Sequence, residues 1–236
     1  MNILEVRNLS KFYSKKKNTG IFDLNFDVKT GSFHAFIGEN GAGKTTTIKT
    51  IIGSYINYQG DVLINGISIK KPDSRQRLGY VPENTIFPKE ITTFEYLKYL
   101  GMLNLKQATE KEKLLQKIDQ MLENFGILDL KNKKPFYFSS GQKKKVLLIQ
   151  ALLNDPELLI LDEPAANLDP TARYQLFKIL KELHQNGTTI FISSHILSEI
   201  KKYVDSFTLI HQGKILYSGA NENNLEEVFY EKVIKN

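Results

Sequence analysis

The chain has 236 residues, of which 41% are hydrophobic and 25% charged, as expected for one compact domain or a domain with a subdomain. It has no cysteine, which excludes a disulfide framework and a thiolate metal site. The net charge is +6, but only four of the 32 basic residues are arginines, the residue that nucleic-acid readers prefer. The lysine excess, including the run at residues 15–17, therefore predicts a solvated surface.

Strands and turns alternate through the N-terminal part of the chain. Residues 3–9 (ILEVRNL) and 21–28 (IFDLNFDV) alternate apolar and polar side chains, which predicts two half-buried strands. SFHAFIG predicts a further strand, and TTTIKTIIG predicts a helix closed by Gly53. The dipeptide Asn65-Gly66 predicts a hairpin turn between DVLI and ISI.

Helical spacing replaces this alternation at residues 91–130. Thr92 and Glu95 stand at the two positions of a capping box, which predicts a helix that begins there. One face of the region is predicted to carry Tyr96, Tyr99, Leu100 and Leu103.

Strands and helices alternate again after residue 139. LLIL and TTIFISS are short apolar runs flanked by helical segments, which predicts buried parallel strands. Residues 171–187 predict a helix that stops at Gly187, ILSEIKKYV predicts another helix, and residues 206–219 predict a hairpin that turns at Gln212-Gly213. The layout predicts an α/β fold with a largely helical insertion at about residues 85–138.

A phosphate-binding pattern lies between a predicted strand and a predicted helix. GENGAGKTT, residues 38–46, places Gly38, Gly43, Lys44 and Thr45 in the pattern G-x-x-x-x-G-K-[ST]. Glycines let the backbone curl so that N–H groups point at phosphates, and the helix N-terminus adds positive charge. We expect Lys44 to neutralise phosphate oxygens and the Thr45 hydroxyl to hold Mg²⁺. A chance match is disfavoured by the strand before the pattern and the helix after it.

Two carboxylates follow the predicted strand LLIL. Asp162 is expected to reach the magnesium ion through water, and Glu163 is expected to polarise an attacking water near the γ-phosphate. The alternative is a helix cap or a surface turn, where Asp and Glu are common. Four apolar residues directly before the pair disfavour a solvent turn, and a buried carboxylate needs a partner or a metal.

With these motifs in order, nearly the whole chain resembles an ABC transporter ATP-binding subunit. FSSGQ, residues 138–142, is similar to the signature segment of that family, Asp169 in NLD matches its loop after the acidic strand, and His195 in ISSHIL matches its switch histidine. Tyr13 in KFY resembles the aromatic residue that stacks on adenine. The resemblance implies a P-loop NTPase core with a largely parallel sheet, an N-terminal antiparallel β-subdomain and a helical subdomain insertion, all in one domain.

The resemblance also implies the binding and catalytic residues. Glu163 and His195 are the implied catalytic residues, and Thr45, Asp162 and Glu83 the implied contacts of Mg²⁺. The implied contacts of ATP are Tyr13, Gly38, Glu39, Asn40, Gly41, Ala42, Gly43, Lys44, Thr45, Thr46, Ser139, Ser140, Gly141, Gln142 and Asp169.

The signature segment carries a prediction about assembly. Ser139 and Gln142 have capping-box spacing, so a helix is expected to begin there with outward-facing N–H groups. Three lysines, residues 143–145, oppose the helix dipole unless an anion is near, and a solvated face is an equal alternative for them. By resemblance, the anion is ATP on a second ATP-binding subunit, identical or related, packed head to tail, so that ATP closes the dimer and hydrolysis opens it.

Two positions depart from the family pattern. Glu83 stands in GYVPEN where the family usually has glutamine, and a carboxylate can still contact Mg²⁺ or water. Ser140 replaces the usual glycine of the signature segment, and its Cβ makes close approach of the backbone to phosphate harder.

No segment is predicted to cross a membrane or to direct secretion. The longest apolar run, residues 146–153, is far shorter than the roughly 18 residues that span a bilayer. Charged residues follow soon after Met1, so no secretory signal is expected. A transporter of this kind would therefore need separate permease subunits, with this chain on the cytoplasmic face of the membrane.

The resemblance places permease docking near Glu83 and the stripe FEYLKYL. The alternative is that Phe94, Tyr96 and Tyr99 build the core of the helical subdomain. The segment resembles exporters more than importers. The competing function is a soluble ATPase of the same superfamily that acts on nucleic acid or the ribosome, although a single phosphate loop and a short insertion disfavour it. A P-loop kinase would have no use for FSSGQ.

Overall fold

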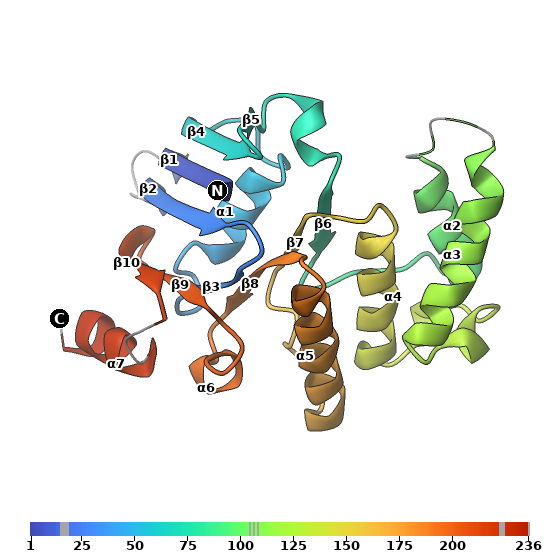
Figure 1. The fold of residues 1–236 in the computed structure, drawn as a ribbon. Coiled ribbons are helices and arrows are strands. Elements are labelled where there is room, and N and C mark those ends of the chain that lie inside the picture. The colour runs from blue at the N-terminus through green and yellow to red at the C-terminus, as the bar shows by residue number, and fades with distance from the viewer. Residues whose placement is uncertain (15–18, 104, 106, 108, 222–224, 236) are drawn as a thin grey trace.

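The computed structural model describes residues 1–14, 19–103, 105, 107, 109–221 and 225–235. The predicted lysine run at residues 15–17 lies outside this part of the chain. Two sheets and a set of helices form the molecule (Figure 1).

The smaller sheet is antiparallel and has the strand order β2-β1-β4-β5. Its strands are β1 (Asn2–Ser14), β2 (Thr19–Lys29), β4 (Gln59–Ile64) and β5 (Ile67–Ser68). Asn65 and Gly66 have φ values of 50° and 72°, the left-handed geometry that a two-residue hairpin needs. The predicted N-terminal antiparallel subdomain and its hairpin are therefore confirmed.

The larger sheet has the order β10-β9-β3-β8-β7-β6, and every neighbouring pair is parallel except β10 and β9. Its strands are β3 (Phe33–Ile37), β6 (Leu78–Val81), β7 (Leu158–Leu161), β8 (Thr189–Ser194), β9 (Ser206–His211) and β10 (Lys214–Ala220). The predicted α/β class with a largely parallel sheet is confirmed.

Helices lie on both sides of the larger sheet and beyond its β6 edge, where α2 and α3 stand apart from the sheets (Figure 1). None of the helices in the described ranges is long and apolar enough to cross a bilayer. The helices are α1 (Lys44–Ile51), α2 (Thr93–Met102), α3 (Glu110–Asn124), α4 (Ser140–Leu152), α5 (Pro170–Gln185), α6 (Leu197–Ile200) and α7 (Leu225–Phe229). Single turns are η1 (Pro72–Arg75), η2 (Leu128–Leu130), η3 (Pro135–Tyr137) and the π-helical η4 (Tyr230–Ile234).

Strand β3 serves two hydrophobic cores. Phe33, Ala35 and Ile37 join the core shared with α4, α5 and the helical insertion, whereas Phe36 joins the core beneath α1 and the antiparallel sheet. This division follows from the two-residue period of a strand. Because both faces are covered, the end of β3 is held firmly where the segment GENGAGKTT begins.

Two predicted details in the helical regions are wrong. Helix α2 turns Leu97 and Gly101 inward, whereas Tyr99 is 64% and Leu103 65% exposed. The inward face is selected by α3, because the side chain of Leu114 occupies the space that a Cβ at Gly101 would need. The helix predicted for ILSEIKKYV is only the four-residue α6.

The predicted capping box at the start of α2 is present and gives a stability prediction. Thr92 Oγ1 accepts the Glu95 N–H at 3.2 Å, and Glu95 Oε2 accepts the Thr92 N–H at 2.8 Å. Thr92→Ala is expected to lower the unfolding free energy by about 1 kcal/mol, and the melting temperature by roughly 2–4 °C. Thr92→Ser, which keeps the hydroxyl, is the control in thermal unfolding. An alanine variant as stable as the serine variant would contradict the assigned cap.

Candidate functional site: a cleft at the carboxyl ends of four strands

The candidate site lies where four neighbouring parallel strands end. Ile37 of β3 pairs with Ser194 of β8, and Leu161 of β7 pairs with both Ile192 of β8 and Val81 of β6. The segments that follow these strands therefore emerge at one edge of the sheet. They carry residues 38–46, Glu83, the pair at 162–163 and His195, so residues far apart in sequence meet there.

The segment at residues 38–46, which we call the phosphate loop, needs glycine at two positions. Gly43 is the residue before α1 and has φ 112°, and a Cβ there would lie 2.7 Å from Ile21 Cγ2. A Cβ on Gly38 would lie 2.3 Å from the carbonyl oxygen of Ile210. The loop therefore packs against β2 and β9 too closely for any side chain at these positions.

A cleft of about 560 Å³ opens beside the phosphate loop. Its walls combine the loop, the start of α1 and the segments after β6, β7 and β8. The lining residues are Asn40, Gly41, Gly43, Lys44, Thr45, Thr46, Glu83, Glu163, Ala166, Asn167 and His195. Of the predicted loop contacts, Glu39 and Ala42 belong to the same loop but do not line the cleft, and neither does Gly38.

Three ionisable side chains converge in the cleft. Lys44 Nζ lies 3.1 Å from Glu163 Oε1, and it also donates to the carbonyl oxygens of Gly38 and Glu39 at 2.7 and 3.0 Å. His195 Nδ1 lies 2.9 Å from Glu163 Oε2. Glu163 thus holds a cation on one carboxylate oxygen and an imidazole on the other. Its backbone has the rare left-handed φ of 43°.

Asp162 is buried directly behind the cleft. Its Oδ1 accepts hydrogen bonds from Ser193 Oγ at 2.8 Å and from Thr45 Oγ1 at 3.3 Å. Burial raises the pKa of Asp162, although these two hydrogen bonds act in the opposite direction. Ser193 Oγ also accepts the Glu163 N–H at 2.8 Å.

Sequence reasoning missed Ser193 and Asn167. Ser193 connects both carboxylates, and Asn167 lines the cleft. The sequence signal for Ser193 is a polar residue near the end of a strand whose centre is apolar. Asn167 lies two residues before Asp169 in the NLD segment, which is the signal for it in the sequence.

Tyr13 lies at the outer end of the phosphate loop and is 56% exposed. Its hydroxyl is 3.0 Å from Thr46 Oγ1, and its ring meets the edge of the Tyr55 ring at a centroid distance of 6.2 Å. Lys11 Nζ lies 4.6 Å from the Tyr55 ring centroid and 5.6 Å from that of Tyr13. The predicted stacking residue is therefore an exposed ring in contact with three neighbouring side chains.

The signature segment does not line the cleft beside the phosphate loop. Ser139 caps α4, with its Oγ accepting the Gln142 N–H at 3.3 Å and Gln142 Oε1 accepting the Ser139 N–H at 3.1 Å. Ser139 and Ser140 are exposed, so the predicted capping box presents them to solvent.

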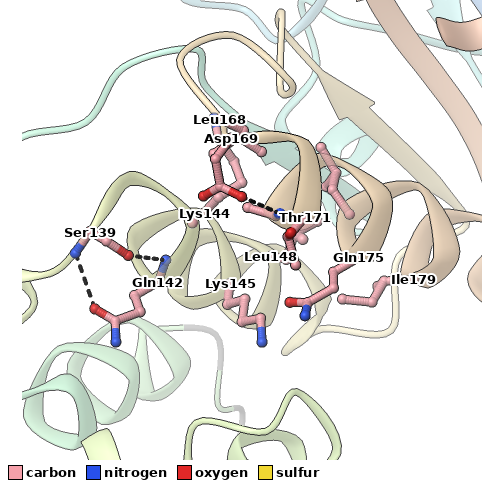
Figure 2. Close-up of a pocket in the computed structure, with 13 residues that line it drawn as sticks. Ser139, Gln142, Lys144, Lys145, Leu148, Leu168, Asp169, Thr171, Gln175 and Ile179 are labelled. Carbon is pink, nitrogen blue, oxygen red and sulfur yellow. Dashed lines mark hydrogen bonds between the residues drawn. The ribbon is translucent and has the colours of Figure 1, made fainter.

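A second, smaller cavity of about 200 Å³ lies between α4 and α5 (Figure 2). Ser139, Gly141 and Gln142 line it together with Asp169, whose Oδ1 accepts the Ala172 N–H at 2.9 Å and caps α5. The structure thus gathers the predicted ATP contacts into two groups, one beside the phosphate loop and one at the starts of α4 and α5.

Neither of the two alternatives stated for the lysines at 143–145 describes Lys144. It is 6% exposed, and its Nζ donates to the carbonyl oxygens of Pro82 and Glu83 at 3.0 Å each. The i to i+4 geometry of α4 turns this side chain inward, whereas Lys143 and Lys145 remain partly exposed.

Comparisons with known proteins agree with this geometry. The family model described as ABC transporter matches residues 21–166. A Mycoplasma pneumoniae protein named as an ABC transporter ATP-binding protein is 48% identical over 229 residues, which cover 96% of this chain and 69% of that protein. The bacitracin transport ATP-binding protein of Bacillus licheniformis is 37% identical over 217 residues, 91% of this chain and 68% of that protein.

The fold is also similar to those of solved structures. The structure of an ATP-binding subunit of an ABC transporter superposes with a TM-score of 0.84 at 32% identity, covering 97% of this chain and 98% of that one. The phosphate loop and the acidic pair both lie within the residues that match the family model. This chain belongs to the ABC transporter family, as an ATP-binding subunit whose ATP hydrolysis powers transport.

Proposed function

We propose that ATP binds with its phosphates on the loop at residues 38–46 and is hydrolysed by water activated at Glu163. The observation that carries this assignment is the contact of Lys44 and His195 with opposite oxygens of the Glu163 carboxylate, inside the cleft. A phosphate group carries more negative charge than one carboxylate, so it competes for the Lys44 ammonium group. Glu163 is then free to accept a proton from water, and His195 orients its carboxylate.

The residues near Thr45 fit a magnesium ion. In the described ranges no three His, Asp or Glu side chains are grouped to hold a metal by themselves, and Mg²⁺ instead takes one or two carboxylates, several waters and substrate phosphates. Thr45, Asp162 and Glu83 are the proposed contacts, direct or through water. A cation there would offset the burial of the Asp162 carboxylate. When bound, Mg²⁺ would supply positive charge that offsets the charge of the phosphate oxygens.

We also propose that two ATP-binding subunits, identical or related, pack head to tail. The support is the separation of the two groups of predicted contacts in one subunit. Ser139 and Ser140 are exposed at the start of α4, where N–H groups and the helix dipole favour an anion. The phosphates on the partner's loop would supply that anion, so ATP binding closes the dimer and hydrolysis opens it.

The proposed cargo direction is export through separate permease subunits, with this chain at the cytoplasmic face of the membrane. Similarity to a bacitracin transport protein supports it, as does the exporter-like segment near Glu83. In the aromatic stripe, the Tyr96 hydroxyl donates to Gln150 Oε1 and its ring packs on Phe87, which assigns Tyr96 to the subdomain core. Tyr99 is the exposed member and the better candidate for a permease contact.

The partner assignment is tested by purifying the full protein in mild detergent from its native membranes. We expect a polytopic membrane protein in near-stoichiometric amount. Ribosomes or DNA-processing proteins in its place would move the assignment to a soluble ATPase of this superfamily, and no partner at all would also contradict the permease proposal. The nucleotide site is tested separately by ATP binding to the purified protein, which is expected whichever partner is found.

Tyr13 gives a second test at the nucleotide site. Tyr13→Ala is expected to weaken ATP binding by about 1–3 kcal/mol, roughly 5- to 150-fold, because base stacking on the ring is lost. Tyr174→Ala, which removes a similarly exposed ring on α5, is the matched control. Equilibrium binding of a fluorescent ATP analogue measures both. Equal affinities for the two variants would remove Tyr13 from the site.

A further inference from the structure

Lys144 is a buried cation that the proposed chemistry does not use. It lies in the second turn of α4, close to the helix N-terminus, where a positive charge is unfavourable. Burial lowers its pKa to about 8, and the carboxylates of Glu83 and Asp162 partly counter that effect. A lysine in such surroundings is kept only by specific partners. Those partners are the carbonyl oxygens of Pro82 and Glu83.

These two hydrogen bonds join the two groups of predicted ATP contacts within one subunit. The Glu83 side chain lines the cleft beside the phosphate loop. Lys144 itself lines the second cavity together with Ser139, Gly141 and Gln142 (Figure 2). The Lys144 side chain therefore connects the second cavity, which it lines, to the backbone of Pro82 and Glu83 beside the cleft.

We propose that Lys144 is a positioning residue that fixes the signature segment relative to the segment of Pro82 and Glu83. A ligand that contacts Glu83 in the cleft then also sets the placement of the start of α4. In the head-to-tail dimer, the signature segment faces the partner's ATP, so this link connects the two nucleotide sites. The inference rests on the proposed function. It adds a contact through which ATP bound at one nucleotide site changes the other nucleotide site of the dimer.

The test compares Lys144→Met with the same substitution at Lys117, a lysine of α3 that contacts the opposite end of α4. Lys117 Nζ donates to the carbonyl oxygen of Leu153 at 2.8 Å and pairs with Asp155, so Lys117→Met also removes a lysine-to-carbonyl link to α4. Amide hydrogen exchange is measured by mass spectrometry with and without a slowly hydrolysed ATP analogue and Mg²⁺. Protein is kept at a concentration where light scattering shows monomers, so protection of the signature segment cannot come from a partner.

In the unaltered protein and in Lys117→Met, the analogue is expected to slow exchange in the phosphate loop and in residues 139–143. In Lys144→Met, the phosphate loop remains protected and residues 139–143 lose their response. In ATPase assays kcat is expected to fall about tenfold to a hundredfold, with KM for ATP nearly unchanged, because the signature segment is misplaced. Lys144→Gln, whose shorter side chain cannot reach both carbonyls, replaces the methionine variant if that variant does not fold.

Protection of residues 139–143 that persists in the Lys144 variant would overturn the proposal. Loss of protection at residues 139–143 in both Lys144→Met and Lys117→Met would also overturn it. The loss would then reflect a general loosening of α4. An unaltered protein that shows protection of the phosphate loop but none at 139–143 would also overturn it. By contrast, no protection of the phosphate loop at all would contradict the proposed nucleotide site, so failure of the two proposals can be told apart.

Discussion

Replacing Glu163 by glutamine is expected to slow ATP hydrolysis by roughly 10²- to 10⁴-fold, the usual contribution of a general base. The amide keeps the size of the carboxylate but cannot take a proton from water. It also ends the ion pair with Lys44, at 3.1 Å, so the lysine remains free for phosphate. ATP binding should therefore be retained, and a stalled ATP-bound dimer should accumulate.

Two measurements check this expectation, steady-state phosphate release and light scattering with ATP and Mg²⁺. Glu157→Gln is the matched control, because Glu157 lies next to β7 at the opposite end of the sheet, where it accepts a hydrogen bond from Asn65 and pairs with Arg77. We expect the control to hydrolyse ATP normally. A Glu163→Gln protein with the normal rate would remove Glu163 as the base, and one that fails to bind ATP would indicate a structural role.

Acidification is expected to destabilise the fold through His34. This side chain is 1% exposed, with its ring nitrogens 2.8 Å from Ser206 Oγ and 2.9 Å from Thr208 Oγ1. Burial lowers the pKa of His34 to about 3 from the ordinary value of 6.5. The unfolded chain therefore binds a proton between these two pH values while the folded protein does not. Stability is fully present above pH 6.5 and is lost as the pH falls toward 3.

The expected loss is about 1.4 kcal/mol per pH unit, or on the order of 5 kcal/mol over the whole interval. Urea unfolding at a series of pH values from 7 to 4 measures it. His34→Gln should be less stable at pH 7, since its hydrogen bonds change, but its stability should fall less steeply with acid. His211→Gln serves as the control for a partly exposed histidine. Equal slopes for the His34 variant and the unaltered protein would contradict the assignment.

Local signals predicted most of the elements because those signals act over a few residues. Asn65-Gly66 and Gln212-Gly213 both adopt left-handed turns, and the capping boxes at Thr92 and Ser139 close within four residues. The cluster of Lys44, Glu163 and His195 was also predictable, because parallel strands end at a common edge.

Features set by contacts between distant segments were not predictable in the same way. The face of α2 depends on how Leu114 fits against Gly101, and both faces of that helix offer apolar residues. Lys144 looked like one of three equivalent lysines, because nothing in the sequence placed the carbonyls of Pro82 and Glu83 beside it. Ser193 reaches Asp162 only because β8 and β7 are neighbours.

The order of strands in the larger sheet determines when the site can form during synthesis. Strand β3, which leads into the phosphate loop, has only β8 and β9 as neighbours in its sheet, and both are made roughly 150 residues later. At about 5–20 residues per second, the ribosome needs on the order of 8–30 s to add that length. Throughout this interval the glycine-rich loop and Lys44 lack the neighbouring strands that hold them. A nascent chain is therefore unable to assemble the ATP cleft until strands β8 and β9 have emerged.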